Sequence, residues 1–137
     1  GAYKPFFDVL DSRINVNYDE DGHKRADAML KVIVDGEIEH TIADGVGPVN
    51  ALNLALKKAL VRFYPEIDDV KLVDYKVRVL DERAGTESKV RVLIESSDGE
   101  ESWSTVGVSE NIIEASWQAL RDSFNYRLFN TIDKKST

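Results

Sequence analysis

The sequence carries one pattern twice, and this repeat limits the folds that the chain can adopt. Strand-like runs near 25–34 and 88–96 are each followed by an Asp-Gly pair, which is a strong signal for a hairpin turn. A second strand-like run follows each turn, near 37–43 and 101–107. Each of these second runs leads through small residues into a helical segment. The repeat therefore predicts two similar units, each containing a hairpin and a helix.

The two halves correspond best when residues 64 positions apart are compared. Thr41 corresponds to Thr105 at this spacing, and the helical segments match through Ala51 with Ala115, Ala55 with Ala119, Leu56 with Leu120 and Lys57 with Arg121. The Asp-Gly pairs match 63 positions apart. One residue of slippage therefore lies between the turns and the later parts of the repeat.

A further alternating run precedes each hairpin, and alternation favours half-buried antiparallel strands. The predicted unit is strand-strand-strand-helix, an α+β class with one helix for each antiparallel sheet. We expect residues 1–137 to form one domain with repeats at about 6–64 and 70–129. Strands are predicted near 13–18, 25–34, 37–43, 74–81, 88–96 and 101–107, and helices near 48–63 and 110–129.

Each helical segment has a wide apolar face that must cover a sheet. In the first this face consists of Val49, Leu52, Leu56, Ala59 and Leu60, and in the second of Ile112, Ile113, Trp117, Leu120, Phe124 and Leu128. Three strands with one helix form a thin unit, which leaves a sheet face or edge without a partner. We expect a homodimer to cover it; in the alternative, the two halves satisfy each other in a monomer.

Composition excludes several classes of partner. The net charge is -7, which disfavours a nucleic acid because an acidic surface repels phosphates. No apolar run approaches the roughly 20 residues needed to cross a bilayer, so no membrane association is expected. Cysteine is absent, which excludes disulfides and thiolate chemistry and is consistent with a cytoplasmic location.

The sequence gives little sign of catalytic or metal chemistry. His23 lies in a charged turn without further ligands at metal-binding spacing, so a solvated turn is favoured. His40 lies on a predicted strand, where a core-facing, hydrogen-bonded role is favoured over lining a site. Asp68, Asp69 and Asp74 join the halves, and such loops are more often solvated than acid-base centres. We therefore assign no catalytic residue and no metal ligand.

The two helix starts are the candidate sites for a small ligand. Both combine small residues with unpaired N–H groups, a place suited to a carboxylate. Space beside them suits an aliphatic group, and Asp44, Glu110 or a main-chain carbonyl suits an ammonium, so a free amino acid fits. The alternative is that these are ordinary helix caps. The candidate effector-binding residues are Asp44, Gly45, Val46, Gly47, Pro48, Ala51, Gly107, Val108, Ser109 and Asn111.

Several long motifs resemble the regulatory domain of the citramalate synthase and 2-isopropylmalate synthase family. They are Leu72-Val73-Asp74-Tyr75-Lys76-Val77-Arg78-Val79-Leu80-Asp81, Arg91-Val92-Leu93-Ile94-Glu95-Ser96, the run from Thr105 to Leu120, and Gly45-Val46-Gly47-Pro48-Val49-Asn50-Ala51-Leu52. The likeness covers nearly the whole chain. The second-half motif is more similar to the citramalate synthase branch.

The resemblance implies properties that the residues alone do not. Family enzymes are acyltransferases that condense acetyl-CoA with a 2-oxo acid in a separate barrel carrying a divalent metal, so the present chain would need no cofactor. Their regulatory domains dimerise and bind the pathway end product, isoleucine for citramalate synthases and leucine for isopropylmalate synthases. Substitutions that relieve feedback would map to Gly45, Gly47 and Ala51. Two alternatives remain: a structural dimerisation module without a ligand, and a small stand-alone enzyme.

Overall fold

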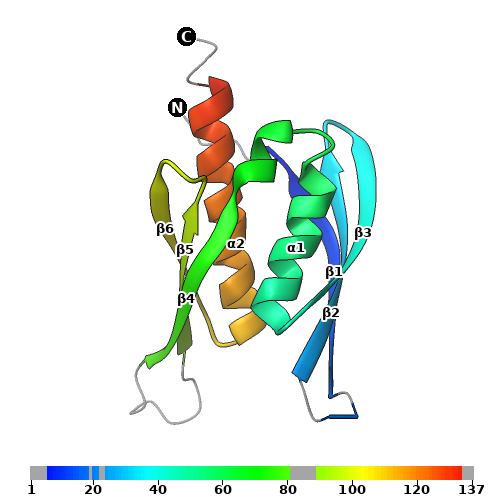
Figure 1. The fold of residues 1–137 in the computed structure, drawn as a ribbon, viewed down its shortest axis with the longest axis vertical. Helices are drawn as coiled ribbons and strands as arrows, with labels where there is room; N and C mark the ends of the chain where they lie inside the picture. Colours follow the sequence, from blue (N-terminus) through cyan, green and yellow to red (C-terminus); the bar gives the residue numbers. More distant parts are fainter. Residues whose placement is uncertain (1–5, 19, 22–23, 81–88, 134–137) are drawn as a thin grey trace. The chain divides into compact units, whose positions relative to one another are not determined.

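The computed structural model describes residues 6–18, 20–21, 24–80 and 89–133, and the chain separates into two compact units, Gly1–Asp68 and Asp69–Thr137. The first unit contains β1 (Asp8–Tyr18), β2 (Lys24–Val34), β3 (Glu37–Gly45), α1 (Pro48–Leu60) and most of a 3-10 turn, η1 (Pro65–Asp69). The second contains β4 (Lys71–Leu80), β5 (Lys89–Ser97), β6 (Ser102–Ser109), α2 (Ile112–Leu128) and a short π-helical end, η3 (Phe129–Asp133). The predicted α+β class is confirmed, because each unit is a three-stranded antiparallel sheet followed by a helix (Figure 1).

The first strand of each unit begins earlier than the alternating pattern predicts. β1 begins at Asp8 and β4 at Lys71, where starts near 13 and 74 were expected. In both strands the register shifts by one residue, between Val9 and Asp11 in one and between Leu72 and Asp74 in the other. A bulge interrupts the two-residue period, so alternation alone cannot follow a strand through it.

The slippage between the repeats lies in the hairpin turns. In the first hairpin Asp35 and Gly36 are the two central residues, both with positive φ, and Val34 pairs with Glu37. In the second, Asp98 bonds with Glu101, so Gly99 is the first central residue. The strands beyond the turns keep the spacing of 64, since Leu30 pairs with Thr41 and Ile94 with Thr105.

In the first unit, α1 packs on β2 and β3. The core consists of alternate β2 side chains, Ala26, Ala28, Leu30, Val32 and Val34, together with the predicted apolar face of α1, all of which is buried. Each buried leucine contributes about 1.5–3 kcal/mol relative to an exposed one. The helix ends at Leu60 rather than near 63, and the 3-10 turn begins at Pro65.

In the second unit, α2 packs on β5 and β6 in the same way. Trp117, Leu120, Phe124 and Leu128 are buried as predicted, whereas Ile112 is 44% exposed and Ile113 is half-buried. The prediction for Ile112 is wrong because this residue begins the helix, before the helix reaches the sheet.

The same kind of hydrogen bond between strand and helix forms at equivalent positions in both units. The Thr41 hydroxyl donates to the Ala55 carbonyl at 2.9 Å, and the Thr105 hydroxyl donates to the Ala119 carbonyl at 2.7 Å. Donors and acceptors are each 64 residues apart, so the repeat extends to individual contacts. The bond satisfies a strand hydroxyl at the buried interface, where an unpaired polar group would cost about 1–3 kcal/mol.

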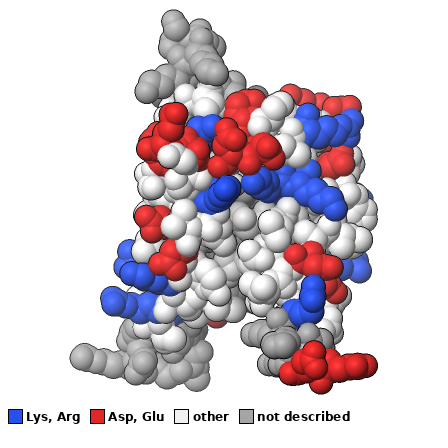
Figure 2. Space-filling model, viewed as in Figure 1, with Lys and Arg blue, Asp and Glu red and all other residues white. Residues whose placement is uncertain are grey.

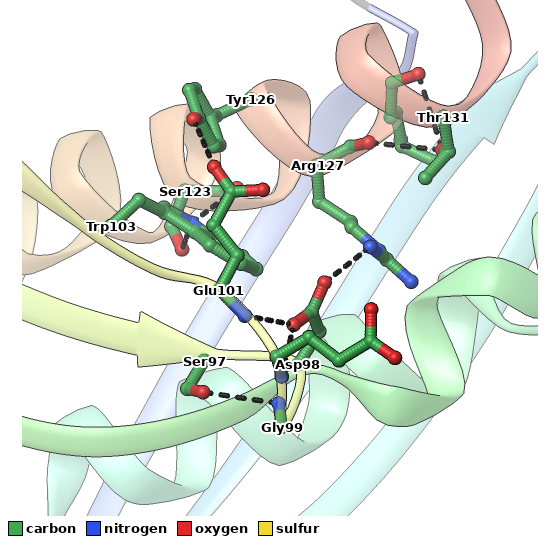
Figure 3. A network of polar contacts seen from close by, with 11 residues as sticks. Ser97, Asp98, Gly99, Glu101, Trp103, Ser123, Tyr126, Arg127 and Thr131 are labelled. Atoms are coloured by element: carbon green, nitrogen blue, oxygen red, sulfur yellow. Dashed lines mark hydrogen bonds and ion pairs between the residues drawn. The ribbon is translucent and has the colours of Figure 1, made fainter. Parts of the chain in front are cut away.

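A polar network fixes the second hairpin turn to the end of α2 (Figure 3). The Asp98 carboxylate accepts backbone N–H groups of Glu100 and Glu101 at 2.9 and 2.7 Å and pairs with Arg127 at 2.6 Å. The backbone bonds, aided by the guanidinium, hold the pKa of Asp98 below its usual value. Nearby, the Trp103 indole N–H donates to Ser123, and Tyr126 donates to Glu101. This network is specific to the second unit, so the repeats differ at this end.

Each sheet has one face that its own helix does not cover. Strand alternation places Met29, Lys31 and Ile33 on this face of the first sheet and Arg91, Leu93 and Glu95 on that of the second. In the described residues, neither helix is long and apolar enough to cross a membrane.

Candidate functional site

The start of α1 lacks a side-chain cap. Gly47 is the N-cap residue with extended backbone (φ -168°), and Pro48 follows at the first helical position, where its missing N–H costs nothing. The Ala51 N–H donates to the Gly47 carbonyl at 2.9 Å. Among the described residues, no group accepts a hydrogen bond from the N–H of Val49 or Asn50. Two donors at the positive end of a helix are therefore available to an anion.

The start of α2 is already capped, so the two helix starts are not equivalent. The Asn111 side-chain oxygen accepts the N–H groups of Ile113 and Glu114 at 2.7 and 3.3 Å. The Ser109 hydroxyl accepts the Asn111 N–H at 3.2 Å, and the Val108 N–H donates to the Gln118 side chain at 3.0 Å. The candidate residues of this start cap the helix or tie it to the strand, and an anion would have to displace Asn111.

Gly45 and Gly107 allow each helix to approach the end of its third strand. A β-carbon on Gly45 would lie 2.6 Å from the Ala51 nitrogen, and one on Gly107 would lie 1.8 Å from the Ala115 carbonyl oxygen. The sequence indicated that these small residues leave room beside a ligand, whereas in the structure backbone atoms occupy that room. Gly47 differs, because a β-carbon there meets nothing within 4 Å.

Asp44 lies on the sheet face away from α1, directly opposite Asp27 on β2. A hydrogen bond with Asp44 raises the pKa of Asp27, desolvation and the charge of Asp44 add to the shift, and Arg25 opposes it. The folded chain thus holds this proton more tightly than the unfolded chain. The pair therefore favours folding at low pH, and this contribution is lost as the pH rises through the raised pKa.

The sequence reasoning missed Asp27, although pairing the two strands outward from the Asp35-Gly36 turn would have brought it opposite Asp44. The position of Asp44 also matters for ligand binding. A ligand at the Val49 and Asn50 N–H groups would lie on the helix side of the sheet, whereas Asp44 lies on the other side. Main-chain carbonyls are therefore better candidates than Asp44 to bind the ammonium group of the ligand. Val46, between Asp44 and the helix, is 80% exposed.

The residues considered for catalysis are not gathered in the structure. His40 is exposed on the uncovered face opposite Lys31, so the expected core-facing role is wrong. Asp68, Asp69 and Asp74 are exposed, as expected for solvated residues, although Asp74 lies within β4 and not in the connection between the halves. His23 lies outside the described residues. Within the described ranges, no group of three or more His, Asp or Glu side chains is placed to hold a metal.

Comparison with known proteins places the chain in a family. Residues 5–128 match the family described as the LeuA allosteric (dimerisation) domain. The (R)-citramalate synthases of Geobacter sulfurreducens and Aquifex aeolicus are 55% and 50% identical over 129 residues, which is 93% of this chain and 24% of each relative. A 2-isopropylmalate synthase of Pseudomonas savastanoi is 33% identical over 114 residues, 82% of this chain and 18% of that protein.

The fold defines a duplicated α+β domain, in which each unit is a three-stranded antiparallel sheet followed by a helix. The chain belongs to the LeuA allosteric (dimerisation) domain family. Within it, the chain is more similar to these citramalate synthases than to the isopropylmalate synthase, which confirms the resemblance found in the sequence. The chain spans about a quarter of the length of these citramalate synthases.

Proposed function

We propose that the chain is the amino-acid-sensing and dimerisation domain of a citramalate synthase, with isoleucine as the feedback effector and leucine as the next candidate. The similarity to citramalate synthases along 93% of the chain carries this proposal. The condensation of acetyl-CoA with a 2-oxo acid, and the divalent metal that assists it, belong to a catalytic barrel elsewhere in the same cytoplasmic polypeptide. The present residues regulate that reaction and perform no step of it.

The start of α1 is the better effector site of the two. The N–H groups of Val49 and Asn50 can receive the isoleucine carboxylate at the positive end of the helix. The open space around Gly47 lets the ligand approach the backbone. The α2 start, from Gly107 to Asn111, takes part only if its Asn111 cap is released or if it supports the ligand from a second copy of the chain.

A second copy of this chain covers an apolar row that α2 leaves bare. Tyr75, Val77 and Val79 lie on the helix side of β4, opposite the buried Val92 and Ile94 of β5 or next to them. They are nevertheless 45%, 42% and 53% exposed, because α2 packs on β5 and β6. Val16 of β1, 44% exposed, has the equivalent place in the first unit. The exposed apolar row of the second unit, with this valine in the first, favours a homodimer.

Regulation then requires isoleucine to bind one arrangement of the dimer more tightly than another. Each tenfold difference in affinity shifts that equilibrium by about 1.4 kcal/mol. The favoured arrangement restrains the catalytic barrel. Tight binding with equal affinity for both arrangements would leave the enzyme active.

The variant Gly47→Asp tests the site. Aspartate is a good N-cap residue, and its carboxylate would itself accept the free N–H groups of Val49 and Asn50. The domain should keep its stability or gain a few tenths of a kcal/mol, while the affinity for isoleucine falls at least about tenfold. Isothermal titration calorimetry and urea unfolding measure the two quantities.

Gly47→Ala is the matched control, because it adds a β-carbon in the same open space without an oxygen. It should keep the fold and lose much less isoleucine affinity than Gly47→Asp, because it adds no charge and no acceptor for the two N–H groups. Full isoleucine affinity in Gly47→Asp would show that the carboxylate binds elsewhere.

A further inference from the structure

The uncovered face of the second sheet carries like charges directly opposite each other. Arg78 on β4 pairs in register with Arg91 on β5, and Lys76 lies one step along the same face, opposite Leu93. Directly opposed side chains in an antiparallel pair have β-carbons about 4.5–5.5 Å apart, and like charges at that separation destabilise the sheet. A local conflict of this kind is typical of a site where binding, rather than stability, determines the residues.

Within the described part of the chain, none of these three cations is neutralised by an acidic side chain. The chain has 25 acidic residues against 18 Lys and Arg, so acidic partners are abundant. Even so, no described acidic side chain forms an ion pair with Lys76, Arg78 or Arg91, and all three are exposed. Figure 2 shows basic side chains gathered at the lower left, where Figure 1 places the lower ends of β4 and β5.

The same residues line a hollow of small-molecule size. Lys76, Val77, Arg78, Arg91 and Leu93 line an open surface hollow of about 480 Å³, within the range of about 300–1,000 Å³ typical of ligand pockets. Val77 points to the opposite face by strand alternation, so it contributes main chain. Leu93 is half-buried and supplies an apolar wall.

Basic and acidic side chains lie at opposite ends of this face, so a charged ligand is oriented along it. Asp74 and Glu95 are also directly opposite each other, one step beyond Lys76 and Leu93, and they line a smaller adjoining hollow of about 60 Å³. The anionic part of a ligand is thus attracted to the Arg78–Arg91 end and repelled from the other end.

We propose that this face is a second small-molecule site, distinct from the α1 start, which binds a ligand carrying a doubly charged anionic group. Paired guanidinium groups recognise phosphate or carboxylate oxygens with bidentate geometry, and Lys76 adds a point charge. Leu93 and the exposed Val106 beside it on β6 contact the apolar part of the ligand. A bound anion also relieves the repulsion between Arg78 and Arg91. The site faces away from α2 and does not depend on the effector proposal.

Nuclear magnetic resonance titration of the chain with pyrophosphate, inorganic phosphate and succinate tests the proposal at constant low ionic strength. We expect saturable chemical-shift changes at β4 and β5. Tighter binding of the two phosphates than of succinate identifies a phosphorylated ligand, and tighter binding of succinate identifies a dicarboxylate. Arg78→Gln and Arg91→Gln should each weaken binding about tenfold or more and should melt no earlier than the unmodified chain, because each removes a repulsion.

Arg13→Gln is the matched control, since Arg13 is an exposed arginine on the uncovered face of the first sheet. It should leave the affinity within twofold. The proposal is overturned if none of the three anions gives saturable shifts at β4 and β5, or if Arg13→Gln weakens binding as much as Arg78→Gln.

Discussion

Replacing Gly107 with alanine is expected to destabilise the second unit by about 3 kcal/mol, the upper end for overpacking a core. The new β-carbon would lie 1.8 Å from the Ala115 carbonyl oxygen and 3.0 Å from the Gln118 β-carbon. Ala115 is buried and its carbonyl belongs to the α2 backbone, so it cannot rotate away as a side-chain end would. The helix must therefore shift from the sheet and disturb the Thr105–Ala119 hydrogen bond.

Urea unfolding followed by circular dichroism measures this loss, with Gly47→Ala as the reference. A β-carbon at Gly47 meets nothing within 4 Å, and its φ is accessible to any residue. Alanine is a poorer N-cap residue than glycine, so that variant should lose at most about 1 kcal/mol, well below the loss in Gly107→Ala. Equal stability of the two variants would show that α2 does not pack against β6 as closely as described. Lost isoleucine binding in Gly107→Ala would reflect the displaced helix and would not identify a ligand contact.

Replacing Val77 with glutamate is expected to weaken dimerisation about 30-fold or more, the effect of losing a central interface residue. Val77 is 42% exposed and lies between Tyr75 and Val79 in the row that α2 leaves bare. Burying an unpaired carboxylate against a second copy is unfavourable, while in the monomer the side chain reaches water. Sedimentation velocity over a concentration series measures the dissociation constant.

Val106→Glu provides the control, because Val106 is 37% exposed on the same sheet but faces the other way. It introduces the same charge and should leave the dimerisation constant unchanged. If the two variants dissociate alike, or if the unmodified chain is monomeric at micromolar concentration, the β4 row is not the dimer surface.

The sequence predicted the fold well where the pattern is local. Alternation, the two Asp-Gly turns and the spacing of 64 residues located six strands and two helices, because each depends on neighbouring residues. It failed at the strand starts, where a bulge before Asp11 and before Asp74 breaks the alternation. It also failed at Ile112 and His40, whose exposure depends on where the helix meets the sheet and which face a strand residue takes.

The candidate site was only partly accessible to sequence reasoning. The helix starts were located correctly in the chain, but their difference arises from tertiary contacts, since Asn111 caps α2 and no side chain caps α1. The sequence does not distinguish a glycine beside open space from a glycine packed against a helix. Only the surroundings of a β-carbon placed at each position distinguish Gly47 from Gly107. Similarly, the opposition of Arg78 and Arg91 depends on strand register.

Parallel calorimetric titration of this chain with isoleucine, leucine and valine tests the central claim most directly. We expect micromolar binding of isoleucine and at least about tenfold weaker binding of leucine and valine. Preference for leucine would instead assign the chain to the isopropylmalate synthase kind of sensor. No heat with any of the three, from a folded dimer, would contradict the sensing role and leave a purely structural dimerisation module.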